Sequence, residues 1–239
     1  MNEEHIHSAY DRDLEQLQTL LIKMGGLVEA AILDAGEALA KRDIELAEKV
    51  RAGDKAIDAL EMEINEDATR IIALRAPMSK DLRAILTTLR LAASLERIGD
   101  YAKNIAKRTT TLVDVPPVNG TDSALRRMSR EVQVMLKDAL DAYLRRDTAL
   151  AEDVRQRDQE VDQMYNALFR EFLTFMMEDP RNITACMHLH FIAKNIERAG
   201  DHVTSIAEQV IYLVDGELPE DEREKSDRTS YVMEQDGDA

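Results

Sequence analysis

The sequence predicts an all-α protein of six helices, arranged as two tandem, pseudo-symmetric three-helix bundles. Three observations support this fold class. Apolar residues recur at helical spacing along almost the whole chain of 239 residues. Only 4% of the residues are aromatic and none is Trp, whereas 33% are charged, a composition typical of helical proteins. Finally, the stretches 34–58 and 138–162 align without gaps, which indicates an internal duplication.

Each element is bounded by capping or breaking residues. Asp43, Asp147 and Asp179 precede apolar-periodic segments and are good N-caps, because an Asp side chain accepts hydrogen bonds from free N–H groups of the first turn. Pro77 and Ser79 mark a break followed by a new cap. The expected helices are 9–40 (with Gly25, Gly26 and Gly36 inside it), a segment between the Asp43 cap and the Pro77 break, 80–112, 123–146, 148–178 and 180–214.

The clearest interruption of the helical pattern is VDVPPVNGTD at residues 113–122. Its adjacent prolines and its Asn-Gly pair are poor candidates for a helix interior. The segment after residue 214 is acidic and poor in apolar residues, a composition typical of disorder. We therefore expect a first repeat at 1–115, a linker at 116–122, a second repeat at 123–214 and an acidic, disordered tail at 215–239.

Charge and composition limit the possible functions. A formal net charge of −16 argues against nucleic acid as a partner, since phosphate binding needs Lys and Arg. Cys186 alone cannot form an internal disulfide, which fits a reducing compartment. The first residues lack the order of a signal peptide, and no stretch approaches the roughly 18 apolar residues of a membrane span. We expect a cytoplasmic protein that reaches the membrane only through its partners.

The repeat alignment reveals an acid-x-x-x-Asp pattern at four equivalent places. An i,i+4 spacing puts both acids of a pair on one helix face. In each half, one pair lies on the second helix and one on the third, and both continue an apolar stripe that faces the neighbouring helix. The four pairs are Asp54/Asp58 and Glu96/Asp100 in the first half, and Asp158/Asp162 and Glu197/Asp201 in the second.

Carboxylates gathered in this way need compensation. At an effective dielectric of about 20, each like-charge contact at about 4 Å costs roughly 4 kcal/mol. The acids must therefore become protonated, pair with Lys or Arg (Lys103 and Arg97 are near in sequence), or bind a cation. An all-oxygen ligand set suits Mg²⁺, Mn²⁺, Ca²⁺ or iron. Gly99 and Gly200, one before each Asp of the third helices, indicate close helix approach or room beside the acids.

The paired motifs ERIGDYAKNIA (96–106) and ERAGDHVTSIA (197–207), with GDKAID and RIIALRAPMSKDLR before them, resemble the PhoU family of regulators of bacterial phosphate uptake. The resemblance covers about residues 5–214. It implies two three-helix bundles, commonly in a homodimer, and metal ligation by E(D)-x-x-x-D motifs. By position, the implied ligands of Mg, Mn, Zn or Fe are Asp54, Asp58, Glu96, Asp100, Asn104, Asp158, Asp162, Glu197 and Asp201. Ser205 replaces the equivalent of Asn104 in the second half.

The resemblance also implies a function. It predicts a non-catalytic adaptor that represses the phosphate-starvation response by contacting PstB, the ATPase of the phosphate ABC transporter, and the sensor histidine kinase PhoR. A ferritin-like oxidase, the main enzymatic rival, needs His three residues after Glu, where this chain has Gly99 and Gly200. A helical scaffold whose acid pairs are purely structural stays open as a hypothesis, and so does a metal-buffering protein unconnected to phosphate.

Overall fold

The computed structural model describes residues 2–118 and 120–219, with side chains from Tyr10 onward. Within these ranges every regular element is helical, which confirms the predicted all-α class. The elements are α1 (Asn2–Lys41), α2 (Ile44–Arg75), α3 (Lys80–Leu112), α4 (Thr121–Arg145), α5 (Thr148–Glu178), the short 3-10 helix η1 (Pro180–Asn182) and α6 (Ile183–Asp215).

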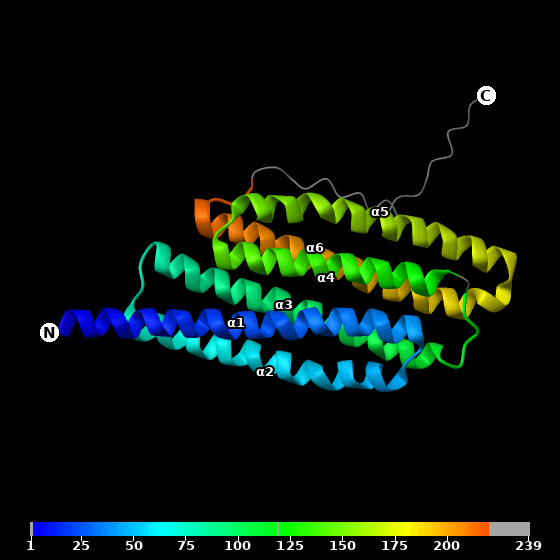
Figure 1. Cartoon of the computed structure of the whole chain (residues 1–239), viewed down its shortest axis with the longest axis horizontal. Helices are drawn as coiled ribbons and strands as arrows, with labels where there is room; N and C mark the ends of the chain where they lie inside the picture. Colours follow the sequence, from blue (N-terminus) through cyan, green and yellow to red (C-terminus); the bar gives the residue numbers. More distant parts are fainter. Residues whose placement is uncertain (1, 119, 220–239) are drawn as a thin grey trace, which may run out of the picture.

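The six long helices form an elongated, two-part bundle (Figure 1). Helices α1, α2 and α3 pack against one another, and α4, α5 and α6 do the same. The halves are joined by contacts of α1 with α4 and of α3 with α6, whereas α2 and α5 lie at opposite outer edges. Buried apolar side chains form one continuous core through both halves. The duplication read from the sequence is therefore a structural one.

Two of the predicted caps are confirmed. The Oδ1 atom of Asp43 accepts a hydrogen bond of 3.0 Å from the N–H of Leu46 at the start of α2. Asp147 makes the same 3.0 Å bond with Leu150 at the start of α5. Each cap satisfies one of the N–H groups that the first helical turn leaves free. The two caps occupy equivalent positions in the repeat, so the duplication includes the local signals that start the helices.

Other boundaries differ from the prediction. Helix α1 begins at Asn2, earlier than the expected Ala9. Ser79 makes no side-chain cap bond, because its φ of 50° places the backbone outside the geometry that an N-cap needs. Asp179 does accept from the N–H of Arg181, but the turn it caps is η1, and α6 begins only at Ile183.

Two of the three glycines of α1 are explained by contact between the halves. A Cβ atom on Gly25 would lie 2.5 Å from Cδ1 of Leu140 on α4. A Cβ atom on Gly36 would lie 2.8 Å from Cβ of Ser129, also on α4. Both distances are too short for real atoms, so the low helix propensity of glycine is accepted here in exchange for close approach of α1 and α4. Gly26 has nothing within 4 Å of such an atom and has no explanation of this kind.

Two further predictions concern the end of the chain and the membrane. Asp215, the first residue of the expected tail, is the last residue of α6, and the tail beyond residue 219 lies outside the described residues. Among the residues that the structure describes, no helix combines the length and apolar character needed to cross a membrane.

Candidate functional site

The acid pairs of the first half meet at the interface of α2 and α3, together with a lysine. Asp54 of α2 is buried, with 4% of its surface exposed. The Nζ atom of Lys103, on α3, lies 2.5 Å from Oδ2 of Asp54 and 3.4 Å from Oδ1 of Asp100. One ammonium group therefore bridges carboxylates from two helices. The hydrogen bond to Asp54 raises the pKa of Lys103, with a smaller contribution from Asp100.

The other two acids of this cluster are half-buried and lie close to like charges. Burial raises the pKa of Asp58, and the nearby carboxylates of Asp54 and Asp100 raise it further, against the ammonium of Lys103. Burial also raises the pKa of Glu96, with a further contribution from Asp100. The carboxylates of Asp58 and Asp100 therefore interact across the α2–α3 interface, and Glu96 interacts with Asp100 on its own helix.

At the solvent side of this cluster are Arg97 and Asn104. Arg97 lies 3.4 Å from Glu96 and 3.8 Å from Asp100, and its side chain is mostly exposed. An exposed pair of this kind contributes little to stability. Asn104 is exposed on α3. Its role as a ligand is implied only by the resemblance to the PhoU family, and it stays a prediction.

The second half buries more of its acids than the first. Asp158 and Asp162 of α5 and Glu197 of α6 are all buried. The Nζ atom of Lys194 lies 2.8 Å from Oε1 of Glu197 and 4.9 Å from the ring centroid of Tyr165. A buried carboxylate is stable only when it is paired or hydrogen-bonded, and Lys194 supplies that pairing for Glu197.

Asp201 and Ser205 lie at the edge of the second cluster and are half-buried. The Ser205 hydroxyl donates to the backbone oxygen of Asp201 at 3.1 Å, so it serves its own helix. A Cβ atom on Gly200 would lie 3.0 Å from Oδ1 of Asp158, whereas one on Gly99 would meet Ile57 first, at 3.1 Å. Both predicted explanations of the motif glycines therefore apply: room beside an acid at Gly200 and close packing at Gly99.

The two clusters are neighbours across the joint between the halves. Tyr101 follows Asp100 on α3, and His202 follows Asp201 on α6. Their rings lie 5.8 Å apart at the α3–α6 contact, and the guanidinium of Arg198 lies over Tyr101 at 5.7 Å. Tyr101 and His202 occupy equivalent positions in the two motifs, so this pair marks the pseudo-twofold relation. Neither the Tyr101–His202 contact nor the role of Lys194 was predicted from the sequence. The equivalent positions of Tyr101 and His202 in the two motifs could have indicated their contact. The i,i+3 spacing of Lys194 and Glu197 could have indicated their ion pair.

The donor chemistry of the two clusters fits a metal ion. All predicted ligands offer oxygen atoms, the donors that hard cations such as Mg²⁺ and Mn²⁺ prefer. In the part of the chain that the structure describes, however, no three His, Cys, Asp or Glu side chains are gathered as metal ligands would be. Lys103 bridges two of the acids instead. Metal ligation by the nine residues stays a prediction.

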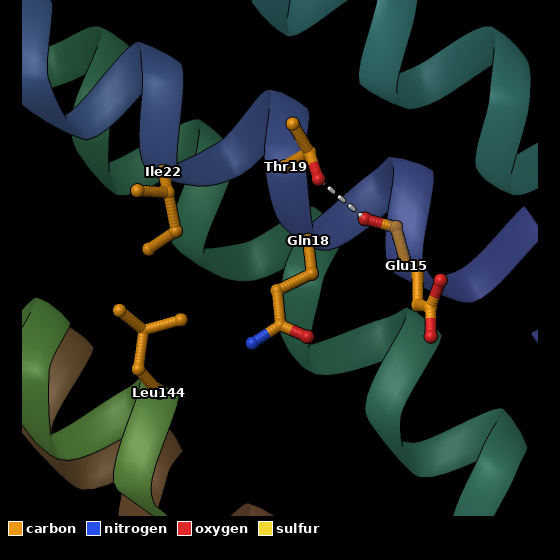
Figure 2. Close-up of a pocket in the computed structure, with 5 residues that line it drawn as sticks. All are labelled: Glu15, Gln18, Thr19, Ile22 and Leu144. Carbon is orange, nitrogen blue, oxygen red and sulfur yellow. Dashed lines mark hydrogen bonds between the residues drawn. The ribbon is translucent and has the colours of Figure 1, made fainter. Parts of the chain in front are cut away.

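A surface pocket elsewhere on the molecule carries no comparable chemistry. It has a volume of about 420 Å³ and lies between α1 and α4, lined by Glu15, Gln18, Thr19, Ile22 and Leu144. Figure 2 shows Ile22 and Leu144 facing each other across it, while the Thr19 hydroxyl donates to the backbone oxygen of Glu15 at 2.8 Å. With one acid and no basic residue, its lining offers no cluster of groups for catalysis or metal binding.

Comparisons with known proteins identify the family of this chain. The family model of the PhoU domain matches twice, at residues 21–109 and 125–210. The chain is 46% identical to a protein of Rhizobium meliloti, over 97% of this chain and 98% of that protein. That relative is described as a phosphate-specific transport system accessory protein PhoU homolog. A relative with the same description from Caulobacter vibrioides is 47% identical, over 94% and 97% of the two chains.

Solved structures of PhoU proteins also match this chain. The crystal structure of PhoU from Pseudomonas aeruginosa matches with a TM-score of 0.85 at 40% identity, covering 87% of this chain and all of that one. The phosphate transport system regulatory protein PhoU of Streptococcus pneumoniae matches with a TM-score of 0.81 at 30% identity, over 88% and 99% of the chains. The resemblance seen in the two motifs is confirmed: the chain belongs to the PhoU family.

Proposed function

We propose that this protein is a regulatory adaptor of a phosphate transport system, which represses the phosphate-starvation response when phosphate is plentiful. The observation that carries the proposal is similarity over almost the full length of relatives described as accessory proteins of phosphate-specific transport. Two matches to the PhoU domain, one in each half, add support because they cover most of the helical body.

The adaptor acts through protein contact in the cytoplasm. Its partners in this proposal are the PstB-type ATPase of the phosphate ABC transporter and the PhoR-type sensor histidine kinase, and it works as a homodimer. A long, all-helical body with two similar halves suits such a role, because it offers extended surface to more than one protein at once (Figure 1). The carboxylates are assigned to cation binding and structure, so the proposal needs no catalytic group.

The same proposal includes metal binding by the two clusters. Asp54, Asp58, Glu96 and Asp100, with Asn104, would hold an ion in the first half; Asp158, Asp162, Glu197 and Asp201 would hold one in the second. A bound divalent ion would supply positive charge to carboxylates on neighbouring helices. The chain's own residues position those carboxylates: the α2–α3 and α5–α6 interfaces hold Asp54, Asp158, Asp162 and Glu197 away from water.

Metal analysis tests this part of the proposal against a purely structural role of the acids. Purified wild-type protein, equilibrated with Mn²⁺ and freed of loose ions, is expected to retain metal. The double variant Asp100→Ala with Asp201→Ala, which removes one acid from each cluster, is expected to lose most of it. Equal and negligible metal in both proteins would favour a purely structural role.

The regulatory part is tested in cells. A strain that lacks the protein and grows with ample phosphate is expected to show high alkaline phosphatase activity, because repression of the starvation response is lost. This readout does not depend on metal binding, so the two parts of the proposal can fail separately.

A further inference from the structure

We propose that Lys103 and Lys194 each supply one positive charge to a carboxylate cluster, and that a metal ion enters the first cluster only by displacing Lys103. This inference rests on the metal binding proposed above and adds the residue that controls it. The lysines are part of the chain, so each cluster is stable when no metal is bound, and metal entry becomes an exchange of one cation for another.

Lys103 occupies the place that a metal ion would need. Its ammonium lies between Oδ2 of Asp54, at 2.5 Å, and Oδ1 of Asp100, at 3.4 Å. These oxygens belong to different helices, and both are among the predicted metal ligands. Metal–oxygen distances in proteins are about 2.0 to 2.6 Å, so an ion bound to both carboxylates would occupy the same space as the ammonium. Steric overlap and like charge make the two cations mutually exclusive.

Asp54 needs a counter-charge whether or not metal is present. Only 4% of its surface is exposed, and an ionised carboxylate at such a position is costly unless it is paired. Lys103 supplies the pairing as the protein is folded. An incoming metal ion can supply the same compensation, so Asp54 is neutralised both before and after the exchange.

Lys103 is also able to leave. Its side chain is 42% exposed, and a lysine carries its charge on a flexible four-carbon stem. The ammonium can therefore rotate into solvent while α2 and α3 stay packed through Ile57 and Gly99. Displacement changes the surface beside Asn104 and places a mobile positive charge next to the filled site.

The second half also has a lysine that pairs with an acid of its cluster, at a different position in the repeat. Lys194 lies three residues before its acid, Glu197, whereas Lys103 lies three residues after Asp100. The repeat-equivalent of Lys103 is Thr204, and that of Lys194 is Ala93. Each half thus brings an ammonium to its cluster from a position where the other half has none. The recurrence of the cation at non-equivalent positions indicates that the cluster itself requires it.

The test compares Lys103→Met with wild type, using the full chain freed of metal by a chelator. Thermal unfolding and Mn²⁺ titration are measured for both proteins. Without metal, the variant is expected to unfold at a lower temperature, because Asp54 has lost its counter-charge. With Mn²⁺ it is expected to regain that loss and to bind at least about tenfold more tightly than wild type, a difference of about 1.4 kcal/mol.

Two control variants make the result specific. Lys107→Met removes an exposed lysine one turn further along α3 and is expected to behave as wild type in both measurements. Lys103→Arg keeps a cation at the site and is expected to keep the metal-free stability and the weaker Mn²⁺ affinity. If wild type binds Mn²⁺ and Lys103→Met binds no more tightly, the exchange is wrong while metal binding stands. If neither the wild type nor any variant binds Mn²⁺, the cation exchange and the proposed metal binding are both wrong.

Discussion

Burial separates the predicted ligands into two groups. Asp54, Asp158, Asp162 and Glu197 are inside the protein, whereas Asp58, Glu96, Asp100 and Asp201 are half-buried and Asn104 is exposed. The buried acids require a counter-charge or hydrogen bonds at all times, whichever cation supplies the charge. The half-buried acids are partly solvated and depend less on such a partner. The repeat pattern alone gives all eight acids the same weight, so this division is knowledge that only the structure supplies.

His190 shows how the two halves diverge at the level of single residues. Its ring lies on α6 beside Tyr165, Phe169 and Phe191, with centroid distances of 6.0, 5.4 and 5.9 Å. The repeat-equivalent residue in the first half is Leu89. Burial lowers the pKa of His190, and the positive charge of Lys194 lowers it further. The imidazole therefore behaves as a neutral packing group.

This environment predicts a pH dependence of stability. A histidine has an ordinary pKa of about 6.5, so as the pH falls below that value the unfolded chain gains the proton before the native one does. The contribution of His190 to stability is thus fully present above about pH 6.5 and is lost as the pH falls toward its lower native pKa. His190→Leu is expected to reduce the drop in unfolding temperature between about pH 7.5 and about pH 5.5. An unchanged drop would show that His190 is not the group responsible.

At the scale of helices, close contact of α1 with α4 depends on glycine. Gly36→Ala is expected to destabilise the protein by about 1–3 kcal/mol, because the new methyl group would overlap buried Ser129. Gly53→Ala is the matched control, since Gly53 lies within α2 with nothing within 4 Å of an added Cβ atom. It is expected to stabilise by about 1 kcal/mol through helix propensity. Denaturant unfolding measures both, and equal effects of the two substitutions would contradict this account of the α1–α4 contact.

The helices themselves follow from local signals, so most of the fold could be predicted from the sequence. Asp43 and Asp147 act within their own first turn, and their caps were predicted because neighbours in sequence decide them. The cap predicted at Ser79 was wrong because its backbone, with a φ of 50°, lies outside the geometry of an N-cap, which the residue type alone does not reveal. The contact of Asp54 and Asp100 with one lysine at the α2–α3 interface agrees with the expectation that these acids face the neighbouring helix, which came from the apolar stripe that they continue.

Contacts that only one half possesses could not be predicted. Arg157 of α5 lies 2.8 Å from Glu131 and 2.7 Å from Asp138 on α4, and these hydrogen bonds raise its pKa against the effect of burial. Its repeat-equivalent is Gly53, and that of Glu131 is Leu27, so the first half has an apolar groove of about 260 Å³ at the same place. Lys194 is also present in one half only, but its i,i+3 spacing to Glu197 is a signal that the sequence does contain. A duplicated pattern predicts what the halves share and is silent on their differences.

At the scale of the whole molecule, the two halves form one body with a shared core rather than two independent bundles. The contacts of α1 with α4 and of α3 with α6 place the two carboxylate clusters on either side of the Tyr101–His202 pair. If the clusters bind ions as proposed, an exchange of one cation for another in either cluster would therefore take place close to the α3–α6 contact between the halves.

The most direct measurement of the central claim is alkaline phosphatase activity in a strain that lacks this protein and grows with ample phosphate. Regulation by this adaptor predicts high activity in the deletion strain, restored to the low wild-type level when the intact chain is supplied from a plasmid. Low activity in the deletion strain, under conditions where phosphate starvation still induces the enzyme, would contradict the proposed role.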